Sequence, residues 1–474
     1  MFFPPDSALT VAALVFCFVL VCVFEFANGF HDTANAVATV IYTNSLKPRV
    51  AVVLSAVMNF LGVLIGGIAV AYALVELLPP DVLSPPNGNP AVPMLVALFA
   101  TALAWNLLTW WFGIPNSSSH CIIGALIGVA VGDALITSRQ VTHAVDWSQI
   151  WGVLRSLAIS PVLGLVGAGL LYWVLRRMVH DKALYEPPHG DRPPTLWVRC
   201  LLILTCTSVS LSHGTNDGQK SIGLIMLTVI GLMPATFALN PHAGAQISRL
   251  PEYAQQAAPL IAKFGDDRKE PALEAARRLQ TLSATLSAGL RTGNEAAQAT
   301  APGASQRNEI AAARSTIRGE VYHLVSQLKE VTESPAATQE EKAEAVKLRA
   351  GMRSAVEYAP WWVRILSATC LGFGTMIGYK RIVRTLGERI GNTHLTPGQG
   401  ACAELVGAGL IATAGFTGLP VSTTHIITSG IAGTMIGSRS GIQPGTLTRI
   451  ALTWICTLPV TIAVAASLFY LLAH

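Results

Sequence analysis

Gly113-Ile114-Pro115-Asn116-Ser117-Ser118-Ser119-His120 recurs in pattern 305 residues later as Gly418-Leu419-Pro420-Val421-Ser422-Thr423-Thr424-His425. Each copy places helix-breaking Gly and Pro just ahead of hydroxyl side chains and an apolar run. An earlier pair, Gly29-Phe30-His31-Asp32 and Gly214-Thr215-Asn216-Asp217, lies 185 residues apart. Motifs repeated in the same order predict that the chain consists of two homologous halves.

The spacings of 305 and 185 residues differ because one polar segment lies inside the second half, between its two motifs. Residues 238–359 hold 15 of the 32 Lys and Arg and 14 of the 27 Asp and Glu, although only 12% of the chain is charged. Soluble domains carry about 25% charged residues. The low proportion of charged residues in the rest of the chain therefore predicts a membrane protein. The insert is rich in Ala, Glu, Arg, Leu and Gln, which predicts a small helical hairpin with a gap at 288–308.

The predicted fold is an all-α polytopic membrane protein with two inverted repeats, broken or re-entrant helices and about ten crossings. Three apolar stretches contain Gly, Pro, Asn, Ser or Asp, and interruptions of this kind inside a bilayer indicate a cavity or pathway; they are 29–46, 114–136 and 200–237. Uninterrupted candidate spans are 8–28, 50–75, 93–112, 150–175, 360–378, 399–416 and 450–472. The predicted domains are a first repeat at 1–176, a basic linker at 177–199, the start of the second repeat at 200–237, the insert at 238–359 and the remainder at 360–474.

Short basic loops orient these spans, because Lys and Arg are concentrated in cytoplasmic loops. With each broken segment crossing once, the basic loops at 47–49, 176–199, 380–389 and 439–449 fall on one side. Both termini are then predicted to lie outside.

The hydroxyl clusters indicate an anion site. Ser or Thr at a helix start leaves backbone N–H groups free, and the positive end of the helix dipole attracts an anion. Two such starts related by inverted symmetry could hold one tetrahedral oxyanion from both sides. Ordinary N-capping and small-residue packing would explain a single copy better, but two copies, each on a broken helix, favour anion binding.

Ionisable residues inside predicted spans are costly, and they indicate a functional site by default. Asp32 and Asp217 occupy matching positions, and Lys220 matches Asn35. Carboxylates beside an anion require an accompanying proton or cation, because uncompensated like charges repel strongly in a low dielectric. For Glu25 a structural and a functional role are equally favoured. Other residues of this kind are His31, His120, His213, Glu404 and His425.

The stretches GFHDTANAVATVIYT, SHGTNDGQKSIGLIML and GLPVSTTHIITSGIAGTMIG together resemble the inorganic phosphate transporter (PiT) family, and they look closest to its bacterial low-affinity members. The resemblance implies a multi-pass protein of the bacterial inner membrane that imports phosphate as a secondary active transporter and is not an enzyme. Asn59 stands where sodium-coupled members carry Glu, whereas Glu404 keeps what the resemblance treats as the corresponding acid of the second half. Proton symport is therefore favoured over Na⁺ coupling, with Mg²⁺ or Zn²⁺ carried as a metal-phosphate complex and no permanently bound cofactor.

The predicted site combines the residue pattern with this resemblance. The phosphate-binding candidates are Ser117, Ser118, Ser119, Ser422, Thr423, Thr424, Lys220 and Asn35. The co-ion or metal candidates are Asp32, Asp217, Asn216 and Glu404, of which Asp32 and Asp217 are the expected metal ligands.

Several alternatives stay open. A sodium-coupled phosphate or sulfate transporter and an anion channel use similar helix ends. The chain contains no His-Glu-x-x-His, Gly-x-Ser-x-Gly or P-loop pattern that would favour an enzyme, and no basic stripe suited to nucleic acid. The expected partners are phosphate, a divalent cation and the lipid bilayer, and a homo-oligomer is compatible with the sequence.

Overall fold

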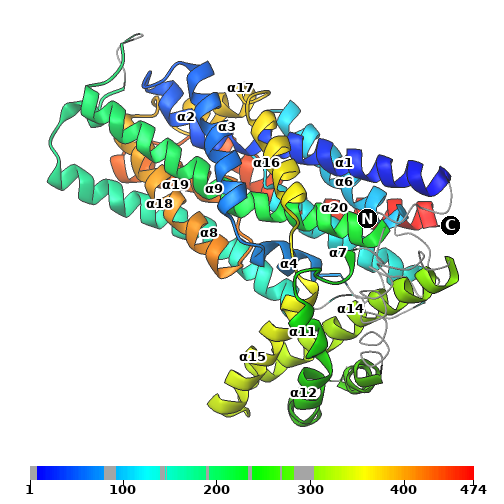
Figure 1. Cartoon of the computed structure of the whole chain (residues 1–474). Helices are drawn as coiled ribbons and strands as arrows, with labels where there is room; N and C mark the ends of the chain where they lie inside the picture. The colour runs from blue at the N-terminus through cyan, green and yellow to red at the C-terminus, as the bar shows by residue number, and fades with distance from the viewer. Residues whose placement is uncertain are drawn as a thin grey trace. The chain divides into compact units, whose positions relative to one another are not determined.

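The computed structural model describes residues 8–78, 92–138, 145, 147–187, 190, 192–232, 237–266, 269–281 and 304–473 (Figure 1). These residues form helices, turns and one isolated bridge between Gly391 and Ile442. The chain divides into two compact units. The insert unit is built mainly on Leu227–Tyr358, and the membrane unit comprises Val15–Pro79, Pro93–Met226 and Ala359–His474.

Among the described residues, eight helical segments are long and apolar enough to cross a membrane: Val11–Tyr42, Pro48–Ile65, Val92–Trp111, Ser118–Ile136, Ile150–Met178, Leu196–Leu232, Pro397–Thr417 and Pro444–Ala473. They belong to α1 (Ala8–Asp32) with α2 (Ala34–Tyr42), and to α3 (Pro48–Ile65), α6 (Val92–Trp111), α7 (Ser118–Ile136), α8 (Trp147–Met178), α9 (Leu196–Leu232), α18 (Pro397–Thr417) and α20 (Pro444–Ala473). Two shorter helices in this unit are α16 (Trp361–Thr375, 15 residues) and α19 (Thr423–Ser438, 16 residues). The all-helical, multi-pass fold predicted from the sequence is confirmed.

One of the three expected interruptions is wrong, because helix α9 runs through Gly214 without a break. A second is slight: α1 ends at Asp32 and α2 begins at Ala34, but Thr33 between them keeps helical φ and ψ. The glycines serve close packing instead. A Cβ at Gly214 would lie 2.3 Å from the carbonyl oxygen of Asn59 on α3, and one at Gly29 would lie 2.4 Å from that of Leu371 on α16. Small residues let membrane helices approach this closely.

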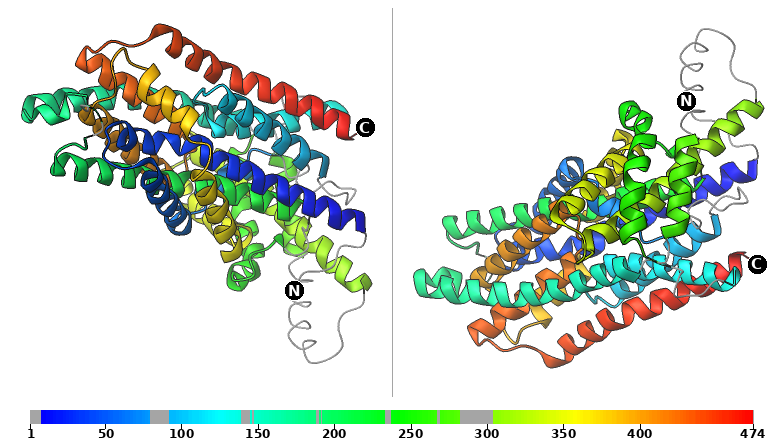
Figure 2. Two further views of the ribbon diagram at one scale, coloured as in Figure 1. Left: turned by 90° about the horizontal axis from the view of Figure 1, so that it is seen from above. Right: turned by 90° about the horizontal axis from the view of Figure 1, so that it is seen from below.

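The two halves exchange their packing partners. Helix α7 packs against α20, and α19 packs against α8, so each helix that follows a hydroxyl motif lies on a helix of the other half (Figures 1 and 2). Glycines make both contacts possible: a Cβ at Gly128 of α7 would lie 2.4 Å from Ile462 O, and one at Gly433 of α19 would lie 2.0 Å from Leu165 O. The cross-half packing makes the repeats one structural body.

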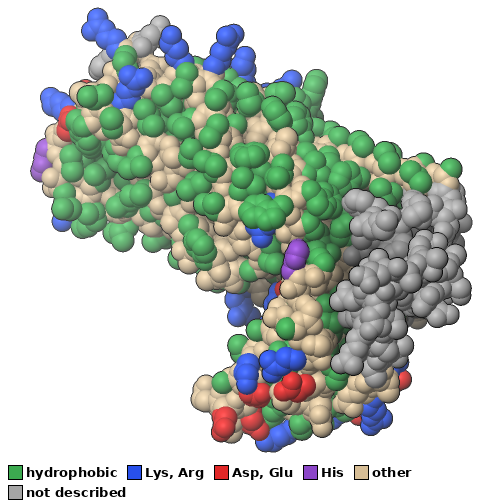
Figure 3. Space-filling view, viewed as in Figure 1, with side chains coloured by type: hydrophobic (Ala, Val, Ile, Leu, Met, Phe, Trp, Pro, Cys, Tyr) green, Lys and Arg blue, Asp and Glu red, His purple; other side chains and the backbone are tan. Residues whose placement is uncertain are grey.

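The basic loops meet at one end of the membrane unit. Arg199 Nε donates to Ser45 O at 2.8 Å, and the Tyr42 hydroxyl donates to Glu388 Oε1 at 2.8 Å. Gln443 Nε2 donates to Gly391 O at 2.8 Å, which joins the last of these loops to the same group. Figure 3 shows Lys and Arg projecting at this end, whereas apolar side chains cover most of the visible face of the unit. Which side of the membrane this end faces stays a prediction.

The insert unit is more than the expected hairpin. It contains α11 (Gly244–Ser248), α12 (Leu250–Phe264), a helix at 269–281, α14 (Ala304–Glu333) and α15 (Gln339–Val356). Its own apolar core includes Leu250, Ile261, Val321, Leu328 and Leu348. The hairpin prediction is wrong because four helices, rather than two, contribute buried apolar residues to one core: α12, the helix at 269–281, α14 and α15. Most of the expected gap at 288–308 lies outside the described residues, and α14 begins at Ala304.

The two ends of the insert lie side by side. Asn240 N donates to Ala355 O at 2.8 Å, and the buried guanidinium of Arg318 donates to Ala238 O and Val356 O. The chain therefore enters and leaves this unit at neighbouring points.

Candidate functional site

The hydroxyl motifs form two matching helix starts. Ser117 caps α7 by accepting a bond from His120 N at 3.2 Å, and Ser422 caps α19 by accepting one from His425 N at the same distance. In the described part of the chain, the next two backbone N–H groups of each helix donate no hydrogen bond. They belong to Ser118 and Ser119 in α7 and to Thr423 and Thr424 in α19. Such first-turn donors at the positive end of a helix can bind an anion.

Asp32, at the end of α1, accepts hydrogen bonds from hydroxyl groups of both helix starts. Ser118 Oγ donates to Asp32 Oδ2 at 2.8 Å, and Thr424 Oγ1 donates to Asp32 Oδ1 at 2.7 Å. His31 Nδ1 lies 3.2 Å from Asp32 Oδ1. Because Ser118 belongs to the first half and Thr424 to the second, a single carboxylate bridges the two repeats.

Lys220, on α9, also bridges the same two segments. Its Nζ donates to Ser119 Oγ at 2.7 Å, to Val421 O at 3.0 Å and to Asp217 Oδ1 at 2.6 Å. Asn216 Nδ2 donates to the same Asp217 oxygen at 2.8 Å. The ammonium is therefore buried with one carboxylate and two neutral acceptors, which is the pairing a buried charge requires.

The internal repeat is visible in single hydrogen bonds. Asn35, the counterpart of Lys220, donates from Nδ2 to Thr424 Oγ1 at 2.9 Å, and Thr424 is the counterpart of Ser119. In each half, a donor three residues after the motif Asp reaches the third hydroxyl of the other half. The site is symmetric in geometry but asymmetric in charge, because an amide stands on one side and an ammonium on the other.

Asp32 and Asp217 also converge on a histidine. One ligand atom each from Asp32, His213 and Asp217 lie within 4.8 Å of one another, and all three residues are buried. His213 Nε2 is 3.2 Å from Asp217 Oδ2, and its Nδ1 is 2.8 Å from Asn59 Oδ1. Two carboxylates and an imidazole are a donor set that suits Zn²⁺ or a similar divalent cation. The sequence marked His213 as an intramembrane residue but did not place it in this group.

The candidate site is sealed from solvent in this conformation. Asp32, Asp217 and Lys220 are each only 1 to 2% exposed to solvent. The hydroxyl residues of both helix starts are buried as well. A ligand can reach these groups only after the surrounding helices move.

Two candidates, Glu404 and Thr423, make no described hydrogen bond to Asp32, Asp217 or Lys220. Glu404 on α18 accepts a bond from Thr205 Oγ1 at 2.6 Å, and it is absent from the described Asp32–His213–Asp217 group. At the 305-residue spacing, α18 corresponds to α6, whereas Asn59 lies on α3. The expected correspondence between Glu404 and Asn59 is therefore wrong. Thr423 is buried in the first turn of α19, in the position that matches Ser118.

Two further intramembrane histidines, which are repeat counterparts, lie against each other. The rings of His120 and His425 are 4.6 Å apart between centroids and tilted by 37°, and His425 stacks on Trp454 at 3.8 Å. They follow the helix starts directly and pack the segment behind them.

Comparison with known proteins gives concordant matches. Residues 28–465 match the model of the "Phosphate transporter family". The chain is 38% identical to the low-affinity inorganic phosphate transporter PitA of Escherichia coli K12, over 97% of this chain and 96% of the relative. PitB of the same strain is also 38% identical, with the same coverage. Because these alignments span nearly the whole of both chains, the relatives also match most of the insert.

One solved structure has a similar fold. The chain described as "The sodium-dependent phosphate transporter" superposes with a TM-score of 0.52 and 18% sequence identity, covering 98% of this chain and 99% of the other. At that identity the likeness concerns the arrangement of helices alone.

Proposed function

The chain belongs to the phosphate transporter family, and from that membership we propose that it imports inorganic phosphate by proton symport, with a neutral metal-phosphate complex as the carried form. The observation that supports this proposal most directly is the meeting of two inverted helix starts with Asp32, Asp217 and Lys220 in one buried network. Free N–H groups and hydroxyls suit a tetrahedral oxyanion, and the carboxylates suit its co-ion.

Charge balance supports a co-transported cation. Two ionised carboxylates and one ammonium leave the network with a net charge of −1 when its histidines are neutral. Adding a phosphate anion would make the net charge more negative. In a low-dielectric site such an excess of negative charge is strongly unfavourable. A proton or a divalent cation that enters with phosphate removes the excess.

The hydrogen bonds suggest how coupling could work. Asp32 accepts the hydroxyls of Ser118 and Thr424, which are the same donors that phosphate oxygens would use. A proton on Asp32, or a cation bound to it, weakens its hold on these hydroxyls and frees them for phosphate. Binding of the two species would then be mutually favourable, and such coupling is reciprocal by necessity.

A divalent cation would interact with Asp32, His213 and Asp217. Their arrangement supports a metal-phosphate substrate in which the cation neutralises the carboxylates and the phosphate together. Because Lys220 already binds Asp217, the cation would have to displace or share that contact. Glu404, which lies outside the network, is retained as a second candidate for carrying the co-ion.

Uptake of labelled phosphate into proteoliposomes tests the proposal. An imposed pH gradient, acid on the side of entry, should drive accumulation above equilibrium, and Mg²⁺ or Zn²⁺ should increase the rate. A sodium gradient alone should not drive accumulation. Accumulation driven by sodium and insensitive to pH would contradict proton symport, and equilibration without accumulation would indicate a channel. Labelled sulfate in the same vesicles separates the two tetrahedral anions.

A further inference from the structure

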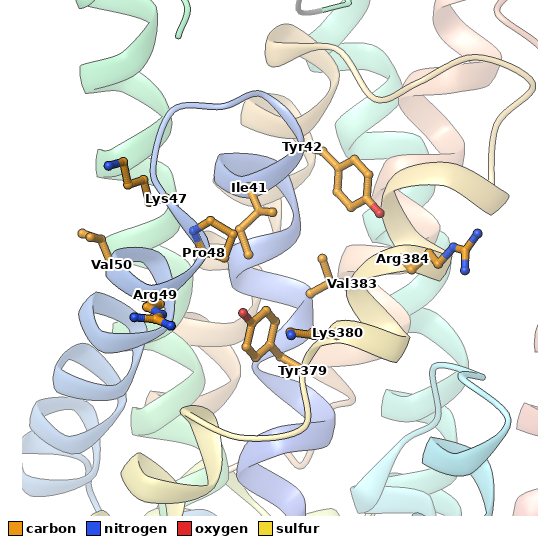
Figure 4. Close-up of a pocket in the computed structure, with 10 residues that line it drawn as sticks. All are labelled: Ile41, Tyr42, Lys47, Pro48, Arg49, Val50, Tyr379, Lys380, Val383 and Arg384. Carbon is orange, nitrogen blue, oxygen red and sulfur yellow. The ribbon is translucent and has the colours of Figure 1, made fainter. Parts of the chain in front are cut away.

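A basic pocket lies at the loop end of the membrane unit, away from the buried network. It has a volume of about 750 Å³ and lies between the α2–α3 turn and the segment around α17 (Lys380–Arg384). Four cationic side chains line it: Lys47, Arg49, Lys380 and Arg384. Figure 4 shows Tyr379 and Lys380 facing Pro48 and Arg49 across the pocket, while Lys47 and Arg384 reach outward on either side.

Most of this positive charge is not compensated. Arg384 Nε pairs with Glu388 Oε2 at 3.0 Å, and Glu388 also accepts the Tyr42 hydroxyl. In the described part of the chain, no ion pair includes Lys47, Arg49 or Lys380. The pocket also contains the first turn of α3, an 18-residue helix whose positive dipole end adds to the same field.

The pocket continues into an apolar stripe. Val50 lines the pocket and begins a row of exposed apolar residues on α3, spaced at three or four positions and therefore on one helix face. These residues are 41 to 66% exposed; they are Val50, Val53, Val57, Leu61 and Ile65. Because α3 qualifies as a membrane-crossing helix, this face is expected to meet lipid chains.

We propose that this pocket binds the headgroup of an anionic phospholipid, whose acyl chains lie along the apolar face of α3. The cations and the helix start match a phosphodiester, and basic pockets at the membrane surface of such proteins recognise anionic headgroups. A free phosphate ion would use the same cations but would gain nothing from the adjoining row of valine, leucine and isoleucine. The combination of charge and stripe therefore favours the lipid.

Lipid binding to the purified protein in detergent tests this inference. Dioleoylphosphatidylglycerol, dioleoylphosphatidylcholine and inorganic phosphate would each be titrated while the apparent unfolding temperature is followed. The wild-type protein should prefer phosphatidylglycerol over phosphatidylcholine by about tenfold in half-saturating concentration, and R49Q/K380Q should lose this preference. The control R176Q/R449Q removes two exposed basic residues outside the pocket and should keep it.

A photoactivatable phosphatidylglycerol covers the case in which the pocket variant fails to fold. In the wild-type protein it should label peptides that contain residues 41–50 and 379–384. Labelling confined to other segments, or an unchanged preference in folded R49Q/K380Q, would overturn the inference. Displacement of the lipid by millimolar inorganic phosphate would identify a free-phosphate site instead. None of these readouts depends on transport, so the outcome is separate from that of the proposed function.

Discussion

The Lys220 ammonium of the second half donates a hydrogen bond to the Ser119 hydroxyl of the first half at 2.7 Å. Its symmetry mate is the bond from Asn35 to Thr424, in which a neutral amide replaces the ammonium. The repeat thus preserves the contact while changing its charge, and Lys220 and Asp217 form the one ion pair between Lys or Arg and a carboxylate among the described network residues.

Removing the Lys220 charge should destabilise the protein. Lys220→Met leaves Asp217 buried without its cation, and breaking a buried pair in this way costs about 3 to 5 kcal/mol. The double variant Lys220→Met/Asp217→Asn removes both charges and should recover most of the loss. The midpoint temperature of thermal unfolding in detergent measures the stability of the single and the double variant. A single variant as stable as the wild type would show that the pair is not buried as described.

The hydroxyl residues should contribute to phosphate binding. Ser118→Ala and Thr423→Ala should each weaken uptake at subsaturating phosphate, by about 0.5 to 1.5 kcal/mol per neutral hydrogen bond and about 1.5 to 3 for one to a charged oxygen. Initial rates of labelled uptake give the values. Thr413→Ala is a suitable control, because that exposed hydroxyl bonds only to Gly409 O of its own helix among the described contacts. Wild-type uptake in both Ser118 and Thr423 variants would remove these residues from the site.

The two motif aspartates should carry the coupling ion. Asp32→Asn and Asp217→Asn keep the side-chain shape but remove the charge, so each correctly inserted variant should lose concentrative uptake under a pH gradient. Phosphate counterflow without a gradient separates coupling from binding. If either variant concentrates phosphate as well as the wild type, its carboxylate has a structural role only.

Gly214 should tolerate no side chain. Gly214→Ala places a methyl group 2.3 Å from Asn59 O, and overpacking of this kind typically costs about 1 to 3 kcal/mol. The shift of α9 should also displace Asp217, one turn later, and reduce transport. Gly409→Ala on α18 is a matched control, because nothing lies within 4 Å of its added Cβ. Equal stability of the two variants in the unfolding assay would show that the α3–α9 approach is looser than described.

The insert should be dispensable for the transport chemistry. Its ends meet at Asn240 and Ala355, so a Gly/Ser linker replacing 245–350 has only a short distance to span. Some uptake driven by a pH gradient should survive in that variant. Complete loss of transport, with a membrane body that still resists protease, would show that the insert takes part in the transport cycle.

The repeat pattern predicts the helical class and the paired helix starts. Asp32, Asp217 and Lys220 meet between these starts, but Glu404 does not. The pattern could not predict which hydroxyl binds which partner, because the contacts of Asp32 with Ser118 and Thr424 join segments from both halves. Such pairings depend on tertiary packing, which a local pattern does not encode. The sequence indicates His213 as an intramembrane residue, but its approach to Asp32 joins α1 and α9, which are far apart in the chain.

Glycine was the main source of error. In a membrane sequence, Gly can interrupt a helix or let a neighbouring backbone approach, and the two cases look alike. Gly113 and Gly418 do end helices, with φ of 64° and 76°, whereas Gly29 and Gly214 lie in helices packed against a neighbour. Proline two residues later distinguishes the first pair from the second.

The pairing of α7 with α20 also has a consequence for biogenesis. Helix α7 is synthesised well before α20, which is the partner of its glycine face. The glycine face of α7 therefore stays uncovered in the bilayer until α20 inserts. A nascent chain that stops before Pro444 lacks this partner, which leaves Gly124, Gly128 and Gly132 without the helix they pack against.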